Sequence, residues 1–103
     1  MVTRAIAYDD YSSFIKQSGV IVVKYFMNKC APCRVLKPTF EKIVNEGSVR
    51  AMEVCLDEFK KENFPHIEKA PSVEFFKDGI SKVVLSGKEL SFAKLNETLH
   101  SVG

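Results

Sequence analysis

The sequence has no tryptophan, few glycines and prolines, and no long apolar segment. Its first ten residues lack the hydrophobic run of a secretory signal, and no stretch reaches the roughly 18–20 apolar residues of a membrane span. Fifteen basic residues stand against thirteen acidic ones, a balance too even to indicate nucleic acid or a membrane surface as partner. We therefore expect a cytoplasmic protein, and in such a reducing compartment a close cysteine pair indicates metal or redox chemistry.

Length and periodicity indicate one α/β domain over residues 1–103. A chain of this length can bury a core without metals or disulfides, and it shows no repeat, low-complexity tract or linker. Short apolar runs alternate with segments of helical periodicity, which is typical of βαβ units. The pattern predicts strands over residues 3–7, 20–27, 49–56, 73–77 and 80–85, and helices over 9–19, 32–45 and 91–102, with a short helix or turn over 57–64.

Local signals predict the ends and faces of these elements. Asp9 or Asp10 should cap the first helix, which would end at Gly19. Pro38 should kink the second helix, and the Lys77-Asp78-Gly79 turn predicts a hairpin of the last two strands. Ser91 should cap the last helix. The residues expected on its inward face are Phe92, Leu95, Leu99 and Val102. This order predicts a central mixed sheet flanked by helices, parallel in its N-terminal βαβ unit and antiparallel in its C-terminal hairpin.

Cys30-Ala31-Pro32-Cys33 directly follows the most apolar strand and opens a helix. Two cysteines three residues apart at a helix start share one face and lie within reach of a disulfide bond. Unpaired N–H groups and the positive end of the helix dipole favour the thiolate, which is the attacking species. Pro32 suits the first turn because it has no N–H group to leave unpaired. We interpret the pair as a redox-active dithiol.

Three other interpretations of the pair remain open. Half of a zinc site would need two more ligands, and only Cys55, His66 and His100 are left, with no second close pair. Two buried structural thiols, or an iron–sulfur site shared between two chains, are the others. Cys55 itself is expected to be a buried thiol that packs as a small hydrophobe, with regulatory oxidation as the alternative.

Several further motifs accompany the cysteine pair at fixed places in the chain. They are the strand-to-cysteine junction (residues 20–33), Pro38, Ala70-Pro71-Ser72, the Phe75-to-Gly79 hairpin and Gly87. On these residues the chain resembles the thioredoxin family over essentially its whole length. The resemblance implies the thioredoxin fold and a thiol–disulfide oxidoreductase that exchanges electrons with protein disulfides.

The resemblance also implies the roles of individual residues. Cys30 would be the nucleophile and Cys33 the resolving thiol. A cis Ala70–Pro71 bond would lie beside them, and the Ala70 backbone would pair with an extended substrate peptide; a simple turn proline is the alternative for Pro71. We expect no metal or cofactor, but a thioredoxin-reductase-like enzyme or another thiol donor must recycle the pair.

The chain departs from the family at three positions. Lys29 replaces the tryptophan before the first cysteine, Ala31 replaces a glycine, and Lys24 replaces a buried aspartate of the central strand. A buried lysine must be paired or lose its proton, and Glu53 on the neighbouring strand is the expected partner. Lys24 would then favour the thiolates as a cation; a neutral lysine acting as base, or a side chain that reaches solvent, are the alternatives.

Positive charge at Lys24, Lys29 and Arg34 should favour the reduced state of the pair and make its disulfide more oxidising than that of an ordinary thioredoxin. The same substitutions keep a second class of function open. In it the chain would be a thioredoxin-fold binding module or a redox sensor with weak or no general reductase activity.

Overall fold

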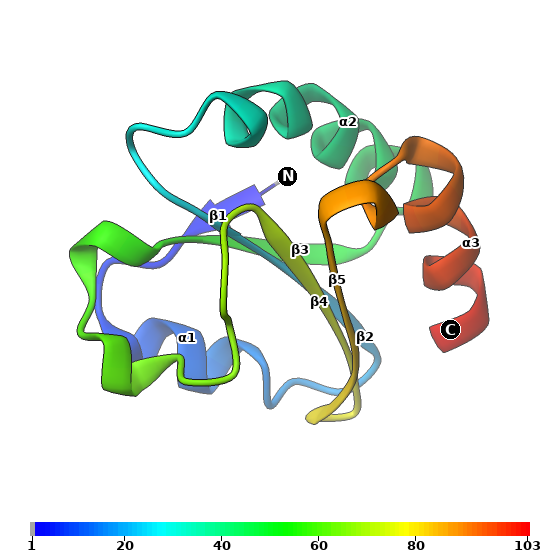
Figure 1. The fold of residues 1–103 in the computed structure, drawn as a ribbon. Helices are drawn as coiled ribbons and strands as arrows, with labels where there is room; N and C mark the ends of the chain where they lie inside the picture. The colour runs from blue at the N-terminus through cyan, green and yellow to red at the C-terminus, as the bar shows by residue number, and fades with distance from the viewer. Residues whose placement is uncertain (1) are drawn as a thin grey trace.

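In a computed structural model that describes residues 2–103, a five-stranded mixed sheet carries helices on both faces (Figure 1). The strands are β1 (Val2–Arg4), β2 (Val20–Phe26), β3 (Arg50–Cys55), β4 (Ser72–Lys77) and β5 (Ile80–Ser86). The helices are α1 (Tyr8–Phe14), α2 (Ala31–Gly47) and α3 (Phe92–Val102). Three short 3₁₀ helices lie at Leu56–Glu58, Lys61–Asn63 and Gly87–Glu89.

The strand order is β1-β3-β2-β4-β5, with β2 in the centre. β3 runs parallel to both β1 and β2, whereas β4 runs antiparallel to β2 and to β5. The predicted mixed sheet, parallel first and closed by an antiparallel hairpin, is therefore confirmed. The β4–β5 turn places Asp78 and Gly79 at positive φ, as a tight hairpin requires.

Two hydrophobic clusters occupy the two faces of the sheet, because successive residues of a strand point to opposite sides. Helices α2 and α3 cover one face and α1 covers the other (Figure 1). The cluster under α2 and α3 consists of Val22, Leu36, Phe40, Ile43, Val44, Ala51, Val73, Phe75, Leu85, Leu95 and Leu99. The cluster under α1 consists of Ala5, Tyr11, Ile21, Val23, Tyr25, Met52, Val54, Phe64 and Phe76.

The first helix differs from its prediction at both ends. It begins at Tyr8 after an extended Ala7 and ends at Phe14, well before Gly19. Asp10 is therefore inside the first turn, where its carboxylate accepts hydrogen bonds from the backbone N–H groups of Ala7 (2.8 Å) and Ile6 (3.0 Å). These two bonds lower the pKa of Asp10. The carboxylate was correctly linked to this terminus, but it reaches back to earlier residues instead of occupying the cap position.

The last helix is capped as predicted, since the Ser91 hydroxyl accepts a hydrogen bond from the Lys94 N–H. Leu95 and Leu99 are buried, and Val102 is half-buried. The inward placement of Phe92 is wrong: its ring is exposed and packs against the Lys42 ammonium, 4.8 Å from the ring centroid. The first turn of this helix thus lies beyond the edge of the core.

Within residues 2–103, no helix combines the length and the apolar character needed to cross a membrane.

Candidate functional site

The site is built where the central strand β2 ends and α2 begins. Cys30 occupies the N-cap position of α2 in an extended backbone conformation. Its sulfur accepts a hydrogen bond from the backbone N–H of Cys33 at 3.2 Å. An N–H donor and the helix dipole both stabilise negative charge on that sulfur, so the geometry supports a thiolate at Cys30.

Cys30 and Cys33 are joined by a disulfide bond, with their Cα atoms 5.3 Å apart. Cys30 is half-buried, whereas Cys33 is only 5% exposed and faces the core under α2. Pro32 stands between them in the first turn of the helix and is exposed. A large partner can therefore approach Cys30 more readily than Cys33.

The Ala70–Pro71 peptide bond is cis, as the resemblance implied. Pro71 and Pro32 line the same apolar groove of about 500 Å³ beside the cysteine pair. The remaining residues of this groove are Ala31, Val35, Leu36, Thr39, Gly87 and Leu90. The fold thus brings the segment before β4 alongside the start of α2, although these segments lie far apart in the sequence.

Lys24 and Glu53 are directly opposite in the β2–β3 register, and they form the expected ion pair. The Lys24 ammonium lies 3.2 Å from the Glu53 carboxylate and 5.4 Å from the ring centroids of both Phe26 and Phe40. The Lys24 side chain is only 4% exposed and the Glu53 side chain 21%. The alternative in which Lys24 reaches solvent is therefore wrong, because Glu53 and the two rings hold its head group inside the protein.

A small cavity of about 200 Å³ connects this ion pair to the redox site. Cys33 lines it together with Lys24 and Glu53, and so do the basic residues Arg34 and Lys37 at the start of α2. The buried cysteine consequently lies in a surrounding where basic side chains outnumber acidic ones.

Asn28 fixes the loop that carries Lys29 and Cys30. Its backbone N–H donates to the Asp57 carboxylate at 2.7 Å, and its side-chain carbonyl accepts from the Cys55 thiol at 3.4 Å. Cys55 is fully buried, which confirms the expected buried thiol. Sequence analysis missed this anchor because the contacts join residues about 30 positions apart, and no local pattern indicates them.

A second polar network lies on the α1 face of the sheet. Glu74 is 1% exposed, and its carboxylate accepts hydrogen bonds from Tyr25 (2.6 Å) and Ser81 (2.6 Å) and contacts His66 (3.0 Å). The Tyr11 hydroxyl lies 3.0 Å from that of Tyr25. Burial raises the pKa of Tyr11 to about 12 and raises that of Tyr25 as well. No partner had been predicted for His66; it links the loop before β4 to the sheet.

The sequence left a zinc site at the cysteine pair open as an alternative. Among residues 2–103, no group of three or more His, Cys, Asp or Glu side chains is placed to hold a metal ion. His66 contacts Glu74, and the His100 ring contacts the Asn96 carbonyl at 2.8 Å. The other residues considered for a zinc site with the cysteine pair are thus dispersed over the fold.

Sequence and structure comparisons agree on one family. A family model described as "Thioredoxin" matches residues 2–101. A thioredoxin of Chlamydia pneumoniae is 31% identical over 101 residues, covering 93% of this chain and 98% of that protein. A chicken (Gallus gallus) thioredoxin is 27% identical, covering 90% of each. The X-ray structure of Fasciola hepatica thioredoxin superposes with a TM-score of 0.85 at 26% identity, covering 98% of this chain and 99% of that one. The chain belongs to the thioredoxin family, and its Cys30–Cys33 pair is that of a thiol–disulfide oxidoreductase.

Proposed function

We propose that the chain reduces protein disulfides in the cytoplasm, with Cys30 as the attacking thiol and Cys33 as the resolving thiol. The observation that carries this assignment is the position of Cys30 at the N-terminus of α2. There its sulfur accepts the Cys33 N–H and is more accessible than that of Cys33. A reducing compartment suits the assignment because only the reduced pair can attack a partner.

The exchange takes place in two steps. The Cys30 thiolate forms a bond to one sulfur of the partner's disulfide, and the other partner sulfur leaves as a thiolate. Cys33 then loses its proton, and its thiolate attacks the Cys30 sulfur, so that the second partner sulfur leaves. Two electrons pass from the dithiol to the partner, and the Cys30–Cys33 disulfide remains.

The partner is best accommodated as an extended segment beside the cis Ala70–Pro71 bond. The apolar groove between Pro32 and Pro71 gives its side chains a binding surface next to the attacked disulfide. A thioredoxin-reductase-like enzyme, or another thiol donor, would return the pair to its reduced state. The mechanism requires no metal or organic cofactor.

Trapping tests the order of the two thiols. Reduced Cys33→Ser should form a lasting mixed disulfide with a protein substrate such as insulin, because Cys30 can attack but nothing resolves the product. Cys30→Ser should form none and should no longer accelerate insulin reduction by dithiothreitol. Turnover by Cys33→Ser at the wild-type rate would contradict the dithiol mechanism. Binding of insulin without reduction by the wild type would instead favour a binding module.

One observation favours a second, narrower role as an oxidant. Lys24, Arg34 and Lys37 share a cavity with Cys33, and cations near the pair stabilise its thiolates and hence its reduced form. Equilibration with glutathione buffers measures the potential of the pair. A value above that of typical thioredoxins would support the oxidant role, and a value at or below it would leave the reductase role.

A further inference from the structure

Lys69 directly precedes the cis Ala70–Pro71 bond. It lines a cavity of about 520 Å³ together with Met27 and Ala70. Its ammonium lies 3.4 Å from the position that a Cβ atom on Gly87 would occupy, and Gly87 lines the apolar groove on the other side of Ala70. The Lys69 charge is therefore placed at the boundary of the two hollows that flank the cis bond.

The backbone at Lys69 is held in place. The Ser72 hydroxyl donates a hydrogen bond to the Lys69 carbonyl at 2.7 Å, and Ser72 begins β4 in the middle of the sheet. Through β4 this segment also connects to Glu74, whose carboxylate binds the loop residue His66. A fixed backbone places the start of the lysine side chain consistently, so its charge acts on a defined region beside Ala70.

The charges near the redox site are unbalanced once ion pairs are taken into account. Two of the acidic groups closest to the site are paired, Glu53 with Lys24 and Glu58 with Arg4, whereas Asp57 accepts only a backbone N–H from Asn28 and keeps its charge. Within residues 2–103, the following basic residues near the site have no ion-pair partner: Lys29, Arg34, Lys37, Lys60, Lys61 and Lys69. In the same described part of the chain, Asp57, Glu62 and Glu68, on the same segments as Lys60, Lys61 and Lys69, also have no ion-pair partner, which leaves six basic side chains against three acidic ones. The surface around Cys30 therefore has a net positive charge, although the whole chain carries only +2.

We propose that Lys69 selects partner segments in which Asp or Glu flanks the reactive disulfide. This inference rests on the proposed function, because it concerns the substrate of the same site. An extended segment that pairs with the Ala70 backbone passes beside the Lys69 ammonium, and a carboxylate there meets an unpaired cation. The more distant Lys60 and Lys61, which line the same cavity, add attraction over a longer range.

Two synthetic peptides with the same intramolecular disulfide, differing only in Asp or Lys next to the cysteines, test the proposal. With dithiothreitol recycling the enzyme at low ionic strength, wild type should reduce the Asp peptide with a kcat/KM about three- to tenfold higher, which corresponds to one to three exposed ion pairs. The ratio should fall towards one at high salt, because salt screens exposed charges. Both peptides meet the same cysteine pair, so the ratio is independent of changes in Cys30 reactivity. Dividing it by the ratio of the two rates with dithiothreitol alone removes the difference in intrinsic reactivity between the peptide disulfides.

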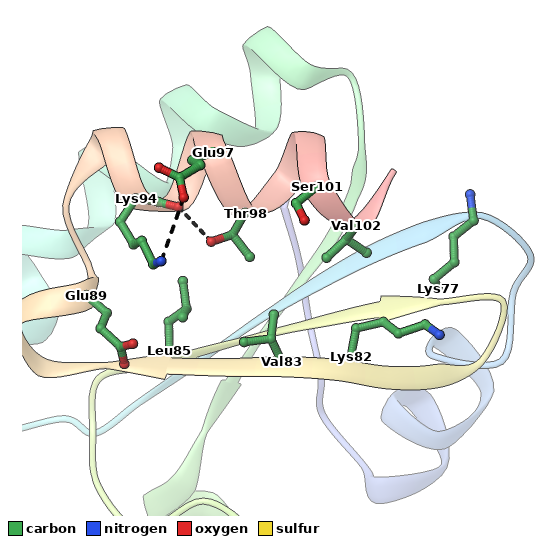
Figure 2. A pocket seen from close by; sticks show the side chains of 10 residues that line it. All are labelled: Lys77, Lys82, Val83, Leu85, Glu89, Lys94, Glu97, Thr98, Ser101 and Val102. Atoms are coloured by element: carbon green, nitrogen blue, oxygen red, sulfur yellow. Dashed lines mark hydrogen bonds and ion pairs between the residues drawn. The ribbon is translucent and has the colours of Figure 1, made fainter.

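Charge reversal at Lys69 identifies the residue responsible. Lys69→Glu should abolish or invert the preference, and Lys69→Gln should give an intermediate ratio. Lys82→Glu is the matched control: it changes net charge equally, but lies near the hairpin end of β5, in a cavity that contains no residue of the site (Figure 2). It should keep the wild-type ratio. Thermal unfolding checks that each variant is folded.

The outcomes separate the two proposals. Equal reduction of both peptides by wild type, or an unchanged ratio in both Lys69→Glu and Lys69→Gln, would overturn the selection by Lys69 while reductase activity stands. The same loss of preference in Lys82→Glu would also overturn it, because overall charge would then be the cause. No acceleration of the reduction of either peptide or of insulin over dithiothreitol alone would overturn the proposed function itself.

Discussion

Replacing the two partners of the Lys24–Glu53 ion pair should destabilise the protein by unequal amounts. Glu53→Met leaves an ammonium whose side chain is 4% exposed, whereas Lys24→Met leaves a carboxylate that is 21% exposed. Breaking a buried ion pair costs about 3–5 kcal/mol when the remaining charge has no access to water. We therefore expect a loss of about 3 kcal/mol for Glu53→Met and, because water reaches Glu53, about 1–2 kcal/mol for Lys24→Met. The rings of Phe26 and Phe40 offset part of the first loss.

The double variant provides the test. Lys24→Met with Glu53→Met removes both charges and fills the space with side chains of similar volume, so its stability should return to within about 1 kcal/mol of wild type. Urea unfolding of the four proteins gives the coupling energy, which these losses put at about 3–5 kcal/mol. A loss of 3 kcal/mol corresponds to a melting temperature lowered by roughly 12–24 °C in a domain of this size. Strictly additive losses, or a larger loss for Lys24→Met than for Glu53→Met, would refute the reasoning.

Brief iodoacetamide treatment of the reduced protein should modify Cys30 before Cys55, because Cys55 is fully buried; mass mapping would contradict this if Cys55 carried most of the label. Tyr11 and Tyr25 should remain un-ionised at about pH 11, because burial raises both pKa values, that of Tyr11 to about 12. The folded state then keeps protons that the unfolded state releases, so the free energy of unfolding should fall as pH rises from about 10 to 12. Ultraviolet titration measures tyrosinate, and a signal from the folded protein equal to that of the unfolded chain would contradict the raised pKa values. Glu74→Gln should cost about 1–3 kcal/mol in urea unfolding, because its amide N–H₂ group faces hydroxyl donors; unchanged stability would show that the carboxylate is not needed.

The elements of the fold that the sequence predicted best are those with strong, local patterns. The nearly continuous apolar run of β2 indicated a central strand, and the Asp78-Gly79 turn indicated the hairpin. The start of the first helix was placed less well. An aspartate favours a helix start either as the cap residue or three positions later, inside the first turn, and the sequence does not show which position Asp10 occupies. The exposure of Phe92 depends on the position at which α3 passes the edge of the sheet, and no local sequence pattern indicates that position.

The functional site likewise contains features that local sequence patterns predict and features that they do not. The cysteine pair follows from its spacing and helix start, and the Lys24–Glu53 contact follows from two charged residues on neighbouring strands. The hydrogen-bond network around Glu74 and the position of Lys69 beside the cis bond could not be predicted from the sequence. Each depends on register and loop placement: Glu74 meets Tyr25 and His66 only after β4 has paired with β2.

The adjacent residues Lys24 and Tyr25 have a consequence for how the central strand finds its alignment. Lys24 meets Glu53 on the α2 face, and Tyr25 meets Glu74 on the α1 face. A slip of β2 by one residue would turn both side chains to the wrong side of the sheet. Glu53 would then lack its cation, and the Tyr25 hydroxyl would face the apolar layer under α2 without an acceptor. The apolar residues of β2 are similar on both faces and would tolerate such a slip, so these two polar side chains discriminate between alignments that hydrophobic burial alone would leave close in energy.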